Sequence, residues 1–269
     1  MTTYTTADLA GPLGEHPPAN RLAGRICLVA GATRGIGRAT AKRMAAEGAA
    51  AVVLAGRQQD LGEGLAAELR DSGTESLFVR TDVTRDEDLR ELVERTTERF
   101  GRLDTVFNNA GMQERRALLA EQTDEVFSQV FDTNVRFLFN AMRYEVPAML
   151  ASGGGAIVNT TSVSGFRNPY TGLALYNASK AAAIALTRSA AMEYAPQGIR
   201  INSVAPGRVV TDMMLATGVD DMQRIAGQLP LRRMGHPEEI AMAAVWLLSD
   251  EASYIAGHIL CADGGFLAG

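Results

Sequence analysis

The chain has 269 residues, 46% of them hydrophobic, and this length and composition suit one α/β domain with a large buried core. Its formal net charge is −5 and its arginines are scattered, which argues against nucleic acid or an anionic membrane surface as a partner. The longest uninterrupted apolar run, 240–248, falls far short of the roughly 20 residues that a membrane-spanning helix needs, so no membrane insertion is expected.

The N-terminal residues and the cysteines indicate a cytoplasmic protein. Residues 1–22 lack the apolar core of a signal peptide, and we expect them to form a flexible arm before one domain, 23–269. Cys27 and Cys261 lie in apolar, strand-like runs, which predicts two buried free thiols in a reducing compartment. No metal site is expected, because the cysteines form no CxxC pair and no metal-ligand spacing links His16, His236 and His258.

From Ile26 the chain alternates short apolar runs with helix-length amphipathic segments, a pattern typical of βαβ units around a parallel sheet. The first run, 26–30, leads into a glycine-rich turn and a helix that extends to about Glu47. Glycines let the backbone approach a pyrophosphate closely, and the helix N-terminus presents N–H groups to it. The turn therefore predicts a dinucleotide site formed by Gly31, Thr33, Arg34, Gly35, Ile36 and Gly37.

The end of the second apolar run, 51–55, bears on which dinucleotide binds. No acidic residue stands there to receive the ribose 2′-hydroxyl of NAD; Gly56 is followed instead by Arg57. Arg57 and Arg34 are placed to flank a 2′-phosphate, which guanidinium groups bind well. We therefore expect NADP(H) as the cofactor. NAD(H) is the alternative, with both arginines solvated and Asp60 on the ribose.

Two further predicted strands, 76–79 and 103–107, are also followed by polar residues. Ligands of open α/β sheets bind at the carboxyl ends of the strands, so these residues are candidates for cofactor contacts, although each also suits a simple turn. The candidates are Asp82 and Val83 after the first of these strands and Asn109, Ala110 and Gly111 after the second.

A long helical segment is expected from about 123 to 152, with Asn134 in its interior, where asparagine is a mediocre helix former. The next predicted strand, 156–160, leads to Ser162 at its end. The last strands are expected at 199–204 and 258–262.

Tyr176 and Lys180 stand one helical turn apart, on the same face of an alanine-rich helix. An ammonium beside a phenol favours the phenolate, and such a tyrosine can pass a proton to or from an alcohol oxygen. The chain has only two lysines, Lys42 and Lys180, so the pairing is informative, although it does not decide the function by itself.

Together these motifs resemble the short-chain dehydrogenase/reductase family over about residues 22–269. The resemblance rests on motifs that occur in the family's order: Gly31-x3-Gly35-x-Gly37, Asp82, Asn108-Asn109-Ala110-Gly111, Asn134, Ser162, Tyr176-x3-Lys180, Pro206-Gly207 with Thr211, and Asp263-Gly-Gly. Two departures are Ala30, where the family usually has threonine, and a Ser162-to-Tyr176 spacing one residue longer than usual, which leaves Ser164 as a less favoured substitute for Ser162.

The resemblance implies a single Rossmann-like, doubly wound parallel sheet of about seven strands with helices on both faces, in a homotetramer or homodimer. It implies that the catalytic residues are Asn134, Ser162, Tyr176 and Lys180, and that further cofactor contacts come from Pro206, Gly207, Val209 and Thr211. The methionine-rich segment at about 208–230 is expected to form a mobile flap over a substrate, with an oligomer contact as the alternative.

The expected reaction interconverts a ketone and a secondary alcohol on a small molecule, by hydride transfer with Tyr176 as the proton donor or acceptor. One alternative is reduction of 3-oxoacyl groups on an acyl carrier protein. The basic residues that such enzymes usually present are replaced here by Asn140 and Gln197, although Arg136 and Arg143 keep that alternative open. An alternative of another class is a non-catalytic sensor that binds NADP(H).

Overall fold

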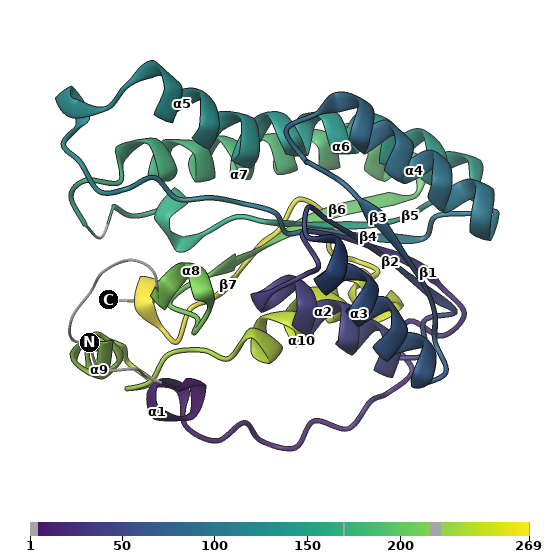
Figure 1. The fold of residues 1–269 in the computed structure, drawn as a ribbon, viewed down its shortest axis with the longest axis horizontal. Helices are drawn as coiled ribbons and strands as arrows, with labels where there is room; N and C mark the ends of the chain where they lie inside the picture. The colour runs from purple at the N-terminus through teal and green to yellow at the C-terminus, as the bar shows by residue number, and fades with distance from the viewer. Residues whose placement is uncertain (1–4, 169, 216–221, 269) are drawn as a thin grey trace.

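The computed structural model describes residues 5–168, 170–215 and 222–268. Its centre is one sheet of seven parallel strands in the order β3-β2-β1-β4-β5-β6-β7 (Figure 1). The strands are β1 (Ile26–Ala30), β2 (Ala51–Gly56), β3 (Glu75–Arg80), β4 (Thr105–Asn108), β5 (Gly155–Thr160), β6 (Ile199–Pro206) and β7 (Ile259–Ala262). This sheet confirms the predicted fold class and its number of strands.

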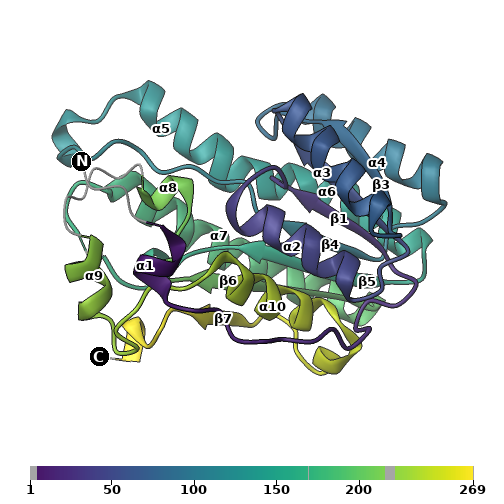
Figure 2. The same cartoon turned by 60° about the horizontal axis from the view of Figure 1, so that its bottom comes forward.

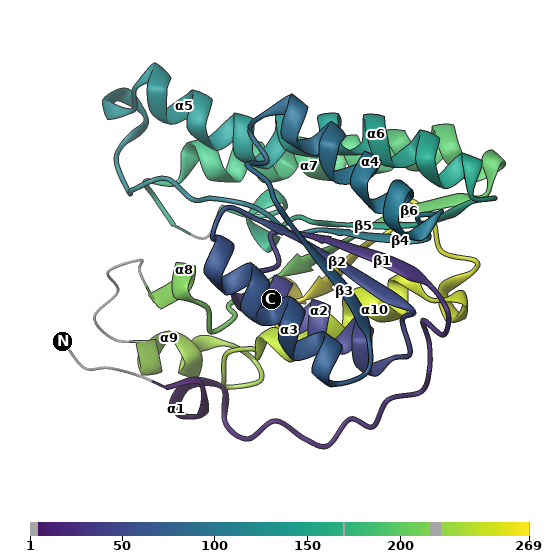
Figure 3. The same cartoon turned by 45° about the vertical axis from the view of Figure 1, so that its right-hand side comes forward.

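The strands form where the sequence has short apolar runs, because helices cover the sheet on both faces and leave its inner strands little contact with water. Every residue of β1, β2 and β4 is buried. Helices α4 to α7 lie on one face of the sheet, and α2, α3 and α10 lie on the other (Figures 1 and 3). These helices are α2 (Gly35–Ala46), α3 (Gln59–Asp71), α4 (Asp86–Phe100), α5 (Asp124–Phe131), α6 (Phe137–Ala151), α7 (Ala174–Tyr194) and α10 (Pro237–Leu248).

The strand order changes direction at β1, because the chain adds β2 and β3 on one side of it and then returns to place β4 on the other. At such a switch point the loops that leave two neighbouring strands diverge to opposite faces, and a crevice opens at the carboxyl ends of the strands. This edge carries the glycine turn after β1, Arg57 after β2 and the 109–111 loop after β4. The fold thus gathers the polar strand ends that the sequence placed far apart.

The expected helix at 123–152 is interrupted in the structure. Between α5 and α6 the backbone forms a π-helical turn, Asp132–Arg136, which widens the helix around Asn134. Such turns are rare, and they often occur at functional sites because they re-aim a side chain.

The thiols differ in part from the expectation. Cys27 and Cys261 are both free, but only Cys27 is buried. Cys261 is exposed and lies on β7, the edge strand of the sheet. Within the described ranges, no helix is both long enough and apolar enough to cross a membrane.

The described part of the expected flexible arm, 5–22, contacts the domain at both of its ends, while residues 12–20 are exposed. Its short helix α1 (Thr6–Ala10) lies beside α9 (Met222–Gln228), as Figure 2 shows, and Leu9 is only 2% exposed. The Met234 N–H donates to the carbonyl of Leu9 at 3.0 Å, and the buried carboxylate of Glu47 accepts N–H bonds from residues 19 and 21. The sequence of the arm lacks a long apolar run, and a few well-placed contacts hold it instead.

The predicted flap at 208–230 contains the short helices α8 (Asp212–Leu215) and α9, while its residues 216–221 lie outside the described part of the chain. Helices α1 and α9 share a small apolar cluster with Val210 and Met234. Closure of this segment over a substrate stays a prediction.

Candidate active site

A cleft of about 1130 Å³ lies along the carboxyl edge of the sheet. Its lining includes every predicted site residue except Gly37 and Asn134, which lie just behind it. Those that line it are Gly31, Thr33, Arg34, Gly35, Ile36, Arg57, Asp82, Val83, Asn109, Ala110, Gly111, Ser162, Tyr176, Lys180, Pro206, Gly207, Val209 and Thr211. The cleft exceeds the volume of most small-molecule pockets and suits a ligand as long as a dinucleotide.

The glycine turn packs without any spare space. A Cβ on Gly37 would lie 2.0 Å from the carbonyl oxygen of Gly31, and a Cβ on Gly31 would lie 2.8 Å from the backbone nitrogen of Ala110. Gly31 also has φ 86, a conformation that side chains other than glycine rarely adopt. Helix α2 begins at Gly35 with no side-chain cap, so its first N–H groups are left for a ligand, as a pyrophosphate site requires.

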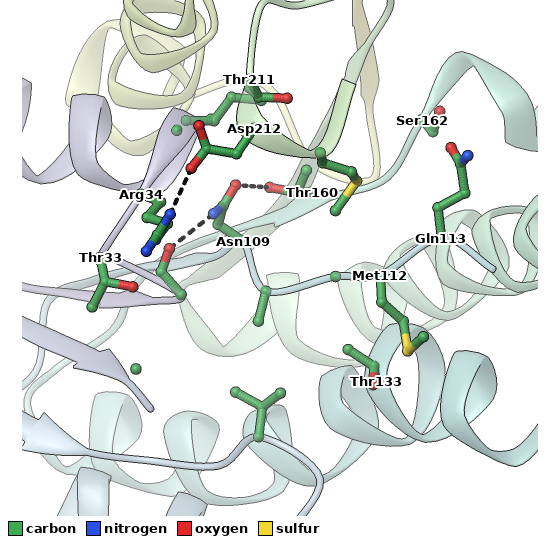
Figure 4. A pocket seen from close by; sticks show the side chains of 18 of the residues that line it. Thr33, Arg34, Asn109, Met112, Gln113, Thr133, Thr160, Ser162, Thr211 and Asp212 are labelled. Carbon is green, nitrogen blue, oxygen red and sulfur yellow. Dashed lines mark hydrogen bonds and ion pairs between the residues drawn. The ribbon is translucent and has the colours of Figure 1, made fainter. Parts of the chain in front are cut away.

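Asn109 links the ends of three neighbouring strands. Its Nδ2 donates to the carbonyl of Gly31 at 3.0 Å, and its Oδ1 accepts from the Thr160 hydroxyl at 3.4 Å (Figure 4). One side chain therefore ties together the ends of β1, β4 and β5. This bonding accounts for an amide at position 109 even before a cofactor is considered.

The two arginines predicted to select the cofactor lie at one end of the cleft. Arg34 donates to Gln58 at 2.9 Å and pairs with Asp212 at 3.1 Å, with 56% of its side chain exposed (Figure 4). Arg57 is exposed and also lines the cleft. Asp60, the alternative ribose partner, lies on α3 and is not part of the lining. This end of the cleft thus holds two arginines, one of them paired with Asp212, and Asp60 does not reach it.

Asp82 contributes a carboxylate to the lining of the same cleft. Burial raises the pKa of its carboxyl, but a hydrogen bond from the Thr84 hydroxyl at 2.8 Å and another from the Thr84 N–H at 3.1 Å hold that pKa below its usual value. The nearby charge of Arg57 acts in the same direction. These contacts fix the carboxylate in one orientation at the strand end.

At the opposite end of the cleft stand Ser162, Tyr176 and Lys180. Ser162 follows β5 and begins a short 3₁₀ turn, where its Oγ accepts from the Ser164 N–H at 3.1 Å. Ser162 lines the cleft and Ser164 does not, so the structure favours Ser162 as the hydroxyl beside Tyr176. Helix α7 presents Tyr176 and Lys180 on one face, with Lys180 Nζ 5.7 Å from the centroid of the Tyr176 ring.

The pKa of Tyr176 differs from the expectation. Desolvation raises it above its usual value, hydrogen bonding to Ser162 lowers it, and the charge of Glu114 raises it further, so the net shift is upward. Lys180 is 3% exposed and donates to the carbonyl of Thr160 at 3.0 Å, and burial lowers its own pKa to about 8. Burial therefore raises the pKa of Tyr176, whereas the pairing with Lys180 was expected to lower it.

Asn134 projects from the π-helical turn and is 1% exposed. Its Oδ1 accepts from the Met112 N–H at 2.9 Å, and its Nδ2 donates to the Met112 carbonyl at 2.8 Å and to Ser179 Oγ at 2.9 Å. The side chain thus fixes the loop after β4 against α7. Its predicted catalytic role stays a prediction.

Glu114 makes contacts near Tyr176 that the sequence did not reveal. This buried carboxylate, 3% exposed, accepts from the N–H of Leu175 at 3.0 Å and from the N–H of Tyr176 at 3.0 Å. It therefore caps the helix that carries Tyr176, although it lies 62 residues earlier in the chain. Local patterns identify caps only within a few residues of a helix, so no sequence signal pointed to it.

We expect Glu114 to position Tyr176 and to raise its pKa. Replacing it in Glu114→Gln keeps an acceptor but removes the charge, so the midpoint of the pH profile for alcohol oxidation, which needs the phenolate, should move to lower pH. Glu114→Ala leaves two buried N–H groups without a partner, which costs about 1–3 kcal/mol of stability, and should lower kcat about 10-fold. A Glu114→Gln midpoint that stays in place or moves upward would contradict this role.

Further lining residues come from the 112–113 loop, from α5 with the π-helical turn, and from α8. They are Met112, Gln113, Ser128, Gln129, Asp132, Thr133, Met213 and Met214. Figure 4 shows Met112 and Gln113 at the Ser162 end of the cleft, away from Arg34. This part of the cleft mixes apolar and amide groups. Among the described residues, no group of His, Cys, Asp and Glu side chains is arranged to hold a metal ion.

Comparison with known proteins shows which family has this architecture. A family model described as enoyl-(acyl carrier protein) reductase matches residues 31–267. The chain belongs to the short-chain dehydrogenase/reductase family. It is 45% identical over 250 residues to an A-factor type gamma-butyrolactone 1'-reductase (1S-forming) of Streptomyces virginiae, a match that covers 91% of this chain and 96% of that protein.

Two other members of the short-chain dehydrogenase/reductase family match over similar lengths. A 3-oxoacyl-[acyl-carrier-protein] reductase of Staphylococcus epidermidis is 38% identical, over 90% of this chain and 98% of that protein. The crystal structure of levodione reductase aligns with a TM-score of 0.88 at 34% identity, over 92% of this chain and 99% of that one. These matches confirm the predicted family and reaction class: this chain is an oxidoreductase that acts on the CH–OH/C=O pair with a nicotinamide cofactor.

Proposed function

We propose that this enzyme uses NADP(H) to interconvert a free ketone of moderate size and its secondary alcohol. The observation that carries this proposal is the position of Ser162, Tyr176 and Lys180 at one end of a cleft whose other end holds Arg34 and Arg57. The cleft's length, its glycine turn and the uncapped start of α2 fit a dinucleotide. When bound, the nicotinamide supplies or accepts the hydride.

The chain's own residues handle the proton and the carbonyl oxygen. In the reducing direction Tyr176, a phenol with a raised pKa, donates its proton to that oxygen. Ser162 donates a hydrogen bond to the same oxygen and stabilises the negative charge that develops on it. At pH values below its pKa of about 8, Lys180 carries a positive charge beside the phenol. This charge favours the phenolate that remains after the proton has been transferred.

Cofactor preference is the most direct test of the two arginines at this end of the cleft. Replacing Arg57 with alanine should weaken NADPH about 10- to 100-fold in kcat/KM, because hydrogen bonds between charged groups contribute about 1.5–3 kcal/mol, and should leave NADH kinetics nearly unchanged. The control is Arg99→Ala, which removes an exposed arginine that pairs with Glu75 away from the cleft. Equal losses with both nucleotides, or a wild-type preference for NADH, would refute the role of Arg57 in selecting NADP(H).

The carrier-protein alternative has less support from this surface. Asn140 is buried, while Arg136 pairs with Asp132 at 2.6 Å and Arg143 lies 3.7 Å from Asp86, so both arginines already have an acidic partner. A non-catalytic sensor would need no proton donor at the cleft, which argues against that class. Assays with NADPH and either free ketones or 3-oxoacyl thioesters separate the three functions.

We also infer a homotetramer or homodimer in the cytoplasm. Two large apolar side chains on the outer surface of α5 and α6 support an oligomer: Phe127 is 47% exposed and Phe139 is 50% exposed. The two cysteines, both free, agree with a reducing compartment.

A further inference from the structure

Three loops at the catalytic end of the cleft meet in a cluster of two arginines and one tyrosine. The guanidinium carbon of Arg208 lies 4.7 Å from the centroid of the Tyr170 ring, and that of Arg116 lies 5.1 Å from the same centroid. Arg116 comes from the loop after β4, Tyr170 from the loop after β5, and Arg208 from the segment after β6. The Arg-Tyr-Arg cluster is therefore a tertiary contact between segments far apart in the chain.

The cluster carries positive charge without a compensating acid. Within the described part of the chain, neither Arg116 nor Arg208 forms an ion pair with a carboxylate, whereas Arg34, Arg38 and Arg43 each do. Burial and, to a smaller extent, the charge of Arg116 together lower the pKa of Arg208 to about 10, with no acid acting the other way. Two guanidinium cations over one ring repel each other, and binding of an anion between them would offset this repulsion.

The cluster is linked closely to the catalytic residues. Arg208 stands between Gly207 and Val209, which both line the cleft. Arg116 follows Glu114 by two residues, and Glu114 binds the N–H of Tyr176. The three side chains themselves are not part of the cleft lining, and these short links connect the cluster to the Ser162 and Tyr176 end of the cleft.

The bonding of the loops keeps the cluster in place. The Ala117 N–H donates to the carbonyl of Gly172 at 3.2 Å, so the loop that carries Arg116 is joined to the one that carries Tyr170. A Cβ on Gly172 would lie 3.3 Å from the Cβ of Arg116, so this contact has little room for a larger residue. The cluster is therefore held by backbone bonding as well as by stacking.

The chemistry of stacked guanidinium groups indicates what they bind. A guanidinium that stacks on an aromatic ring keeps its N–H edge available, and that edge matches the two oxygens of a carboxylate. We propose that Arg116 and Arg208, held by Tyr170, bind a carboxylate borne by the substrate, so that the preferred substrate is a keto acid or hydroxy acid. This assignment rests on the proposed ketone reduction at the same site, and it adds the charge of the substrate.

The kinetic test compares one carbon skeleton with and without the charge. With NADPH, the wild type should reduce 4-oxocyclohexanecarboxylate at least 10-fold better in kcat/KM than its methyl ester. Arg208→Met and Arg116→Met should each lower kcat/KM for the acid about 10- to 100-fold and change that for the ester less than 3-fold. The matched control is Arg115→Met, which removes a neighbouring exposed arginine outside the cluster and should keep the preference for the acid. Equal use of acid and ester by the wild type would overturn the proposal, and so would equal losses on both in the variants.

A binding test separates this proposal from the proposed reaction. Cyclohexanecarboxylate has no carbonyl to reduce, so its calorimetric titration into protein saturated with NADP⁺ needs no turnover. Binding by the wild type that weakens 10-fold or more in Arg208→Met, but not in Arg115→Met, would support the carboxylate site even if no ketone were reduced. No binding by the wild type, or binding that Arg208→Met leaves unchanged, would overturn it. If only the proposed ketone reduction were wrong, neither the acid nor the ester would be turned over, but cyclohexanecarboxylate would still bind.

Discussion

Replacing Tyr176 with phenylalanine should lower the turnover number by about 10²-fold or more and leave NADPH binding within a few-fold of the wild type. The variant loses only the hydroxyl that we propose as the proton donor, while the ring keeps its packing beside Lys180. The measurement is NADPH consumption, followed by absorbance with a reducible ketone, together with titration of NADPH fluorescence to measure binding.

The matched control for this prediction is Tyr254→Phe, because Tyr254 is fully exposed and lies outside the cleft lining. That variant should have wild-type turnover. Near-wild-type turnover in Tyr176→Phe would show that another group donates the proton, and the assignment of the catalytic end of the cleft would fail with it.

Replacing Gly37 with alanine should destabilise the domain and abolish cofactor binding together. The new Cβ would lie 2.0 Å from the Gly31 carbonyl oxygen and 2.7 Å from Asn109 Nδ2. The first of these is a backbone atom and cannot move aside, so the glycine turn must shift; overpacking of this kind costs about 1–3 kcal/mol or more. We expect a melting temperature lower by about 5 °C or more, since about 1 kcal/mol shifts it by roughly 2–4 °C in a chain of this size.

Gly64→Ala is the control for Gly37→Ala. Gly64 lies within α3, and a Cβ there would have no other atom within 4 Å, so alanine should keep or slightly raise the melting temperature. Thermal unfolding with and without NADPH checks both variants. If Gly37→Ala keeps the wild-type melting temperature and the rise that NADPH causes, the glycine turn has more room than the structure shows.

The parts of the fold predicted correctly from sequence are those with local signals. The strands β1, β2 and β5 were expected within one residue of their observed ends, because strands buried on both faces appear as short apolar runs. The glycine turn before α2 and the helical spacing of Tyr176 and Lys180 are equally local. Because parallel strands align their carboxyl ends, this information was enough to predict that most of the cofactor residues share one cleft.

Features that depend on the environment of a side chain were predicted less well. Lys180 was expected to lower the pKa of Tyr176, but burial raises that pKa, and the extent of burial depends on the walls that other loops build. Cys261 was expected to be buried, and it is exposed on β7, the edge strand of the sheet. An apolar run shows that a strand forms, but not how much of it a neighbouring layer covers.

The amino-acid sequence by itself determined the strands, the glycine turn and the Tyr176 and Lys180 pair, since each depends on periodicity or spacing within about one element. It also determined the family, through the order of these short motifs along the chain. Only the tertiary structure decided that Glu114 caps the Tyr176 helix, that α1 packs on α9, and that Arg116 and Arg208 share the ring of Tyr170. These contacts join segments that are far apart in the sequence. Their geometry follows from how the whole chain packs, so no local pattern of residues encodes it.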